Sequence, residues 1–259
     1  MADTKTAALQ ENEQIKELLA LLSKVEGNRD KEFNKLIKYV DTMEKQFDRV
    51  SAELMDVRGQ LADMQKSPVR DALAGMVKAV ENKVQTAREQ LAGIKTAIVE
   101  GAARTLEQVK HAGLSGLNKM VSFMGIKDGL NAMRGELNGS IADARRTIAK
   151  VEAVGEELRS VGGHVKNAAH AATGKERQDV DASKEGRFQA GLLAPLRSVR
   201  DMMANMEKTA GAAVMQLERL EQAAEKKPSV RENLQALKNA EKLDKPAPPK
   251  QKATPEAAL

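Results

Sequence analysis

The sequence predicts an all-α fold of elongated coiled-coil helices or antiparallel helical hairpins, followed by a disordered C-terminal tail. Three observations indicate this fold. The 259 residues include only one Tyr, four Phe and no Trp, although large rings supply much of the buried area in compact cores. Strong helix formers such as Ala, Leu, Lys and Glu are abundant. Apolar residues recur at steps of three and four, and the period-two runs typical of strands are missing.

The first part of the chain, 1–66, is expected to form N-terminal helices that include a coiled coil over 33–64. Apolar residues there alternate at steps of three and four without interruption. Such a 3.5-residue repeat keeps one seam against a partner helix when the helices supercoil. A straight amphipathic helix in a bundle is the alternative, and it would drift off this register. The seam consists of Phe33, Leu36, Val40, Met43, Phe47, Val50, Leu54, Val57, Leu61 and Met64.

The next part, 67–163, is expected to contain two long helices separated by a glycine-rich corner at 111–129. Ser67-Pro68 suits a helix start, because Ser caps the first turn and Pro needs no N–H partner there. A break at this point favours an antiparallel hairpin with the preceding helix over one bent rod. The second of the long helices should end at Gly162-Gly163.

Residues 164–190 are interpreted as a polar linker, because their apolar periodicity is weak. Periodicity returns in 191–243, which predicts a heptad helix with Pro195 near its start and then a short helix capped by Ser229. The Pro- and Lys-rich tail, 244–259, is expected to be disordered. The predicted C-terminal seam contains Leu196, Val199, Met203, Met206, Leu217 and Leu220.

The sequence predicts no catalytic, cofactor-binding or metal site. Gly174-Lys175 fails the phosphate-loop pattern, because Ala169 stands where glycine is needed and Glu176 where Ser or Thr is needed. His164 and His170 are six residues apart, which does not suit two ligands on one helix face, and His111 is distant from both. The histidines are therefore interpreted as surface or linker residues.

Other polar and small residues receive structural interpretations. The acidic pairs Glu156-Glu157 and Asp179/Asp181 are expected to be solvated charges, because acid–base catalysis needs a pocket that shifts pKa values. The spacings Gly125-x-x-x-Gly129 and Gly135-x-x-x-Gly139 favour close packing between helices of a bundle. Phe188 is expected to dock onto its own protein rather than onto a partner.

Four stretches carry a resemblance to a known group of proteins. They are Lys38-Tyr39-Val40-Asp41-Thr42-Met43-Glu44, Val121-Ser122-Phe123-Met124-Gly125-Ile126-Lys127-Asp128, Glu157-Leu158-Arg159-Ser160-Val161-Gly162-Gly163-His164 and Lys184-Glu185-Gly186-Arg187-Phe188-Gln189. With these stretches the chain resembles an uncharacterised family of helical, coiled-coil proteins carried on integrative conjugative elements of Firmicutes gut bacteria. The resemblance implies a mobile genetic element as the setting and no particular chemistry.

These observations predict a non-enzymatic coiled-coil scaffold or adaptor that pairs with itself, as a homo-oligomer or within one chain, and with an unknown protein. The alternative is a nucleic-acid-associated accessory protein of DNA transfer, suggested by a net charge of +5, although clustered cations and aromatic platforms are lacking. A phasin-like membrane-surface protein centred on Leu114–Met133 is a weaker alternative. No apolar stretch reaches the roughly 20 residues of a membrane span. The absence of cysteine excludes disulfides, and a cytoplasmic location is expected.

Overall fold

The computed structural model describes residues 8–24, 28–113, 124–173, 176 and 186–225. Within these ranges the chain forms five α-helices and one short 3-10 helix, and it contains no strand. The prediction of an all-α fold is therefore confirmed. The predicted helix capped by Ser229 and the predicted disordered tail lie outside the described residues.

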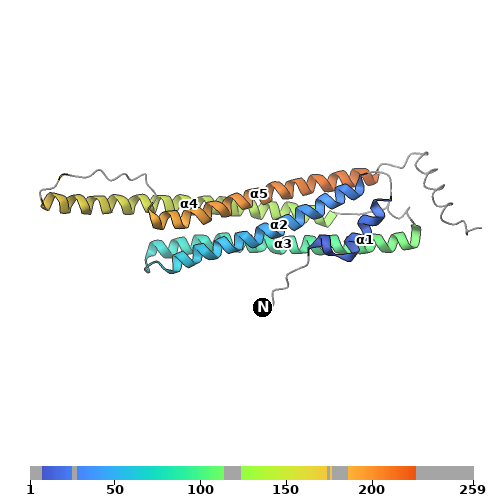
Figure 1. Ribbon diagram of the computed structural model, residues 1–259, viewed down its shortest axis with the longest axis horizontal. Helices are drawn as coiled ribbons and strands as arrows, with labels where there is room; N and C mark the ends of the chain where they lie inside the picture. The colour runs from blue at the N-terminus through green and yellow to red at the C-terminus, as the bar shows by residue number, and fades with distance from the viewer. Residues whose placement is uncertain (1–7, 25–27, 114–123, 174–175, 177–185, 226–259) are drawn as a thin grey trace, which may run out of the picture.

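Four long helices form an antiparallel bundle. They are α2 (Arg29–Ala62), α3 (Pro68–Ala112), α4 (Met124–Ala172) and α5 (Arg187–Glu225). Figure 1 shows them lying along one axis and alternating in direction from each helix to the next. Helices α2 and α4 each pack against both α3 and α5, so every helix has two neighbours in a closed ring. The predicted helical hairpins thus combine into a single four-helix rod.

The short helix α1 (Glu13–Leu22) packs on α2 and α3 and is anchored through the buried Asp41. The Asp41 carboxylate accepts hydrogen bonds from the backbone N–H groups of Leu9 at 2.9 Å and Gln10 at 3.3 Å. These residues begin the 3-10 helix η1 (Leu9–Glu11), whose free N–H groups favour an acidic partner. Asn12 then caps α1 by accepting from the next free backbone N–H groups.

The turn between α2 and α3 follows the predicted start signal. Pro68 occupies the first turn of α3, and the Ser67 hydroxyl accepts a hydrogen bond from the Arg70 N–H at 3.2 Å. The Arg70 side chain in turn donates from Nε to the carbonyl of Leu61 at 3.0 Å, which gives this carbonyl in the last turn of α2 a second donor besides the Met64 N–H. The two helices consequently form the predicted antiparallel hairpin rather than one bent rod.

One continuous hydrophobic core runs through all four long helices and beneath α1. Every residue of the predicted α2 seam is buried except Met64, which is partly buried against the core. The six predicted seam residues of α5 are buried as well. Because α2 and α5 pack against each other, the predicted helical pairing takes place inside one chain.

The prediction that Gly162-Gly163 ends a helix is wrong, and so is the linker prediction at both of its ends. Helix α4 continues through both glycines to Ala172, and α5 already begins at Arg187. Glycine lowers helix propensity by about 1 kcal/mol relative to Ala but does not forbid helical dihedrals. Four alanines, at 168, 169, 171 and 172, follow within the next ten residues and sustain the helix, so nothing local stops it there.

Pro195 also lies elsewhere than predicted, because it is the ninth residue of α5 rather than part of its first turn. A proline in a helix interior cannot donate to the carbonyl four residues earlier, here that of Gly191. The bare Cα of Gly191 faces α2 closely, since a Cβ there would lie 2.7 Å from the Oε1 atom of Gln60. The first turns of α5 therefore depend on packing against α2 and α4 rather than on an ideal hydrogen-bond ladder.

Replacing Phe47 by Ala tests the dependence on this core. Phe47 is fully buried, so we expect Phe47→Ala to lower the free energy of unfolding by about 3–5 kcal/mol. The matched control is Met55→Ala on the same helix, because Met55 is 70% exposed and its loss should change stability by no more than about 0.5 kcal/mol. Denaturant unfolding followed by circular dichroism measures both, and equal losses would contradict the fold.

Candidate interaction surface

Ion pairs between neighbouring helices use many of the charged side chains of the bundle. Lys95 on α3, with its side chain only 4% exposed, donates to both carboxylate oxygens of Glu44 on α2, at 2.8 and 2.7 Å. Arg134 on α4 donates to Glu207 on α5 from two nitrogens, at 2.9 and 2.6 Å. These pairs fix the position of each helix along the bundle axis relative to its neighbour. They leave the charges bound within the rod rather than directed at a ligand.

Asp143 is the centre of a further interhelix pair. Its carboxylate accepts from the Lys83 ammonium on α3 at 2.7 Å and from Arg146 one turn later on α4. The hydrogen bond from Lys83 lowers the pKa of Asp143 below its ordinary value, and the bond from Arg146 lowers it further. The carboxylate is therefore held in its charged form, as suits a structural pair and not a proton carrier.

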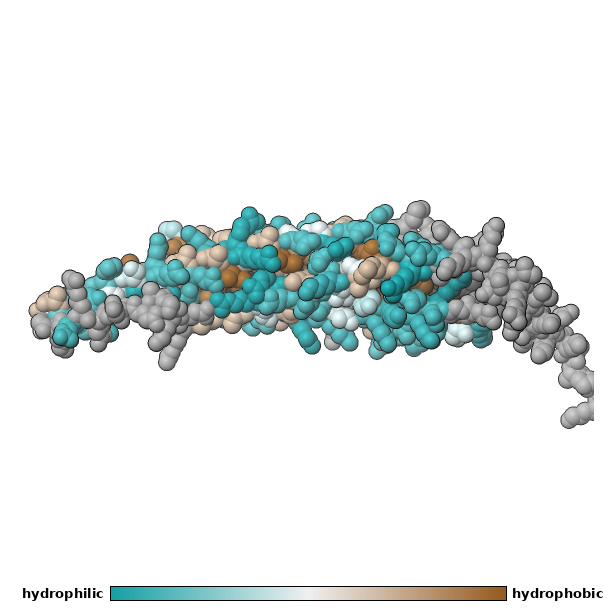
Figure 2. Space-filling model, turned by 90° about the horizontal axis from the view of Figure 1, so that it is seen from above, coloured by the Kyte–Doolittle hydropathy of each residue, from teal (hydrophilic) through white to brown (hydrophobic). Residues whose placement is uncertain are grey.

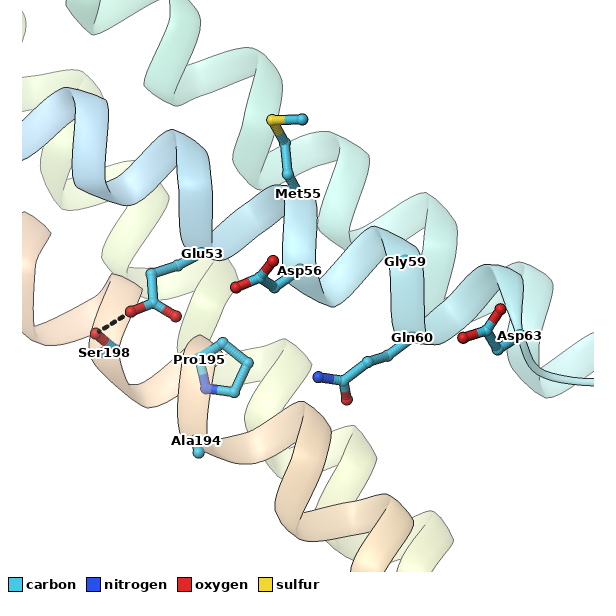
Figure 3. A pocket seen from close by; sticks show the side chains of 9 residues that line it. All are labelled: Glu53, Met55, Asp56, Gly59, Gln60, Asp63, Ala194, Pro195 and Ser198. Atoms are coloured by element: carbon cyan, nitrogen blue, oxygen red, sulfur yellow. Dashed lines mark hydrogen bonds between the residues drawn. The ribbon is translucent and has the colours of Figure 1, made fainter.

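An open groove of about 580 Å³ lies between the end of α2 and the start of α5. Figure 3 shows Glu53 and Asp56 on α2 and Asp63 just past its end, with Pro195 of α5 opposite. Glu53 accepts a hydrogen bond from the Ser198 hydroxyl at 3.1 Å, so it joins the two helices. Met55 at the rim is largely exposed. The groove is thus a shallow acidic furrow beside the start of α5, without an enclosed centre.

A more distinctive surface is the free end of α4. Figure 1 shows this helix extending well past the ends of α2 and α3. We call residues 156–172 the α4 overhang. Leu158, Val161 and Val165 on it are 62%, 60% and 65% exposed. They are half of the six large hydrophobic side chains found exposed among the described residues. Figure 2 shows a largely hydrophilic outer surface along the rod, and three exposed large apolar side chains within one short stretch of helix mark a candidate contact surface.

The apolar row of the overhang continues the core row of α4 without a change of register. Val151 is 3% exposed within the bundle, and Leu158, Val165 and Ala172 follow it at successive intervals of seven residues. Residues at this spacing stay on nearly the same helix face. The face of α4 that α3 and α5 cover inside the bundle therefore emerges uncovered beyond the ends of those two helices.

The start of the overhang is fixed by the first turns of α5. The side-chain amide of Gln189 packs on Gly155, where a Cβ atom would collide with it. Gln189 also accepts a hydrogen bond from Arg159 and donates to the carbonyl of Glu152. The overhang therefore leaves the bundle from a firmly packed base.

The remaining predicted site residues do not gather into a site. His111 is exposed at the end of α3, and His164 and His170 lie on the overhang. Across the described ranges, no three His, Asp or Glu side chains come together as metal ligands would. Glu156-Glu157 lie at the base of the overhang, while Asp179/Asp181 and Gly174-Lys175 fall outside the described residues.

The glycine spacings fit close helix packing at one position of each pair. A Cβ at Gly129 would lie 3.0 Å from Ile94, and a Cβ at Gly139 would lie 3.0 Å from the Lys83 ammonium. Gly125 and Gly135 face open space. Phe188 is the second residue of α5, and its side chain lies outside the described part of the chain. The predicted membrane-surface segment Leu114–Met133 is described only from Met124, and no described helix has the length and hydropathy to cross a membrane.

The overhang itself was missed by sequence reasoning. The signal was present as the seven-residue spacing from Val151 through Leu158 and Val165, but the glycines at 162 and 163 divided it between a helix and a supposed linker. The local sequence pattern does not show how far α4 extends beyond the other helices. The row is exposed because α2 ends and α3 begins before the overhang is reached.

Comparison with known proteins gives a family without an assigned role. The model of a family described as "Family of unknown function (DUF6674)" matches residues 11–258. No curated protein matches the chain, and no solved structure matches it.

The pair between Asp143 and Lys83 gives a pH-dependent prediction. Asp143→Asn should lower the free energy of unfolding at neutral pH by about 1.5–3 kcal/mol, because Lys83 loses its charged acceptor. The lowered pKa of Asp143 means that its stabilisation is complete above the ordinary value near 3.8 and is lost as pH falls through the folded-state value. The deficit of the variant should therefore shrink below about pH 4.

Denaturant unfolding between pH 7 and pH 2.5 measures this dependence. Asp128→Asn is the matched control, because Asp128 is an exposed carboxylate on the same helix and its loss should have little effect. A deficit for Asp143→Asn that stays constant over the whole pH range would refute the role assigned to the pair.

Proposed function

The chain belongs to the family of unknown function DUF6674, and we propose that it is a non-enzymatic helical scaffold or adaptor that binds partner helices through the α4 overhang. The bundle supplies a rigid rod, and the overhang supplies the contact surface. The proposal replaces the predicted seams of α2 and α5 as the binding surface, because those seams are already covered within the chain.

The observation that carries the proposal is the uncovered apolar row of the overhang. Leu158, Val161 and Val165 lie on one side of the helix and are all more than half exposed. Full burial of a Leu or Val side chain is worth about 1.5–3 kcal/mol, so covering this row would supply a useful fraction of a binding free energy. An amphipathic helix with anchors at such spacing binds another helix or an apolar groove.

The rigidity of the rod supports the same role. A continuous core, the pair between Lys95 and Glu44, and the pair between Arg134 and Glu207 hold the long helices at fixed heights. Because α4 belongs to this core over most of its length, the overhang is a direct extension of a packed helix. A contact made at the overhang is consequently transmitted to the whole rod.

The nucleic-acid alternative receives less support from the described residues. Several cations on the bundle are each paired with an acidic residue of a neighbouring helix, which reduces their availability for phosphates. These cations are Lys83, Arg88, Lys95, Lys127, Arg134 and Arg197. The setting on a mobile genetic element and the cytoplasmic location stay predictions.

The double variant Leu158→Glu/Val165→Glu tests the proposed function. It places two carboxylates on the apolar row without touching the bundle core. We expect proteins that co-purify with the tagged full-length chain from cells of its source organism to fall by at least about tenfold, since each lost apolar contact is worth more than about 1.4 kcal/mol. Quantitative mass spectrometry measures this loss.

The matched control is Met215→Glu, which changes an exposed methionine on the flank of α5, 57% exposed and away from the overhang. It should leave the co-purifying set unchanged. Recovery of the same proteins with the double variant, the control and the unmodified chain would refute the overhang as the binding surface.

A further inference from the structure

We propose that the α4 overhang binds the overhang of a second copy of this chain, with the two helices antiparallel about a two-fold axis beside Val165. This inference rests on the proposed function and names the partner. Two rods would then be joined end to end through their free helix ends.

The row is complementary to itself when it is reversed. Leu158 and Ala172 lie seven residues to either side of Val165. A two-fold axis at Val165 therefore sets the large Leu158 of one copy opposite the small Ala172 of the other and sets the two Val165 side chains against each other. Large-against-small pairing fills an interface evenly, and the same patch serves both copies, as a two-fold interface requires.

Small residues beside the row allow the two helices to approach closely. Gly162 has open space around its Cα, with nothing near the position of an added Cβ. Within the same helix, Gly155 already accepts the Gln189 side chain at such short range that a Cβ would collide. Gly162 lies seven residues beyond Gly155 and so continues a strip of α4 that is already used for close packing.

The length of the overhang suits a second overhang. Residues 156–172 extend about 25 Å at the usual helical rise. With the axis at Val165, Ala172 of the second copy lies level with Leu158, short of the Gly155–Gln189 contact where α5 begins. Each helix end thus stops where the bundle of the other copy starts. The two overhangs cover each other without displacing α5.

The charges favour the antiparallel sense. Glu156 and Glu157 lie at the base of the overhang. A parallel pair would set the two acidic bases level with each other, whereas the antiparallel pair separates the Glu157 residues by about 24 Å along the axis. Separating these acidic residues favours the antiparallel sense, whereas the two Lys166 residues lie within about 3 Å of each other along the axis in either sense. Arg159 donates a hydrogen bond to Gln189 of its own chain.

Sedimentation and light scattering of the purified full-length chain measure the association. The expected result is a species with twice the mass of one chain. Leu158→Glu/Val165→Glu should weaken its association by more than about tenfold, while Met215→Glu should leave it unchanged. Circular dichroism and Tm confirm that each variant is folded. A monomeric unmodified chain, or a double variant that still dimerises, overturns the proposal.

Single cysteines determine the orientation and do not depend on the glutamate variants. The chain contains no native cysteine, so Val165→Cys and Leu158→Cys each introduce one thiol. A disulfide needs Cα atoms within about 7 Å. We expect oxidation to link two copies of Val165→Cys but not of Leu158→Cys, whose thiols would lie about 21 Å apart along the axis. Cross-linking of both, of neither, or of Leu158→Cys alone overturns the antiparallel pair.

The two proposals fail separately. If the unmodified chain is monomeric but its co-purifying proteins still depend on Leu158 and Val165, the second copy is the wrong partner and the adaptor function stands. If neither self-association nor co-purification depends on these residues, both proposals fail.

Discussion

The fold depends on one constraint, which is that an apolar row recurring at steps of three and four residues must be covered by other helices along its whole length. Four such rows, one on each of α2, α3, α4 and α5, cover one another in a closed ring and produce a single continuous core. Because the chain has few aromatic residues, this core is a narrow column of aliphatic side chains and two phenylalanines of α2. The long shape of the molecule follows from that column.

The same constraint explains the exposed surface of the α4 overhang, because α4 is longer than the helices that cover it. Helices α2 and α3 end together at the Ser67-Pro68 turn, but α4 continues for several further turns with its row intact. The apolar row of α4 is covered only as far as its neighbouring helices extend. Ion pairs such as Lys95–Glu44 and Asp143–Lys83 fix the heights of the helices, and thereby fix how much of α4 extends beyond them. The position of the candidate surface is therefore set by the packing of the bundle, although no residue of the bundle core belongs to it.

The extent to which the sequence predicts this molecule follows from how local each signal is. The α2 row from Phe33 to Leu61 and the start signal at Ser67-Pro68 are local patterns, and the structure buries the row and begins α3 at Pro68. The identity of the partner helix is not local, because a heptad row shows that a helix is covered and not which helix covers it. The row of α5 from Leu196 to Leu220 packs against α2.

The pair Gly162-Gly163 led to a wrong prediction of a helix end, because glycine weakens a helix without ending it. The first turns of α5 were not predicted, because the packing of Gln189 on Gly155 stabilises them. Exposure of Leu158 and Val165 depends on the ends of helices distant in sequence.

The central claim is that the rows are covered within one chain along the bundle and uncovered on the α4 overhang. Hydrogen exchange of backbone amides, followed by mass spectrometry at increasing protein concentration, tests it most directly. The account predicts that residues 130–151 of α4 are strongly protected at every concentration, whereas residues 156–172 exchange readily in dilute protein and gain protection as the concentration rises. Protection of residues 130–151 that appears only in concentrated protein would contradict the account, because the bundle would then form between chains.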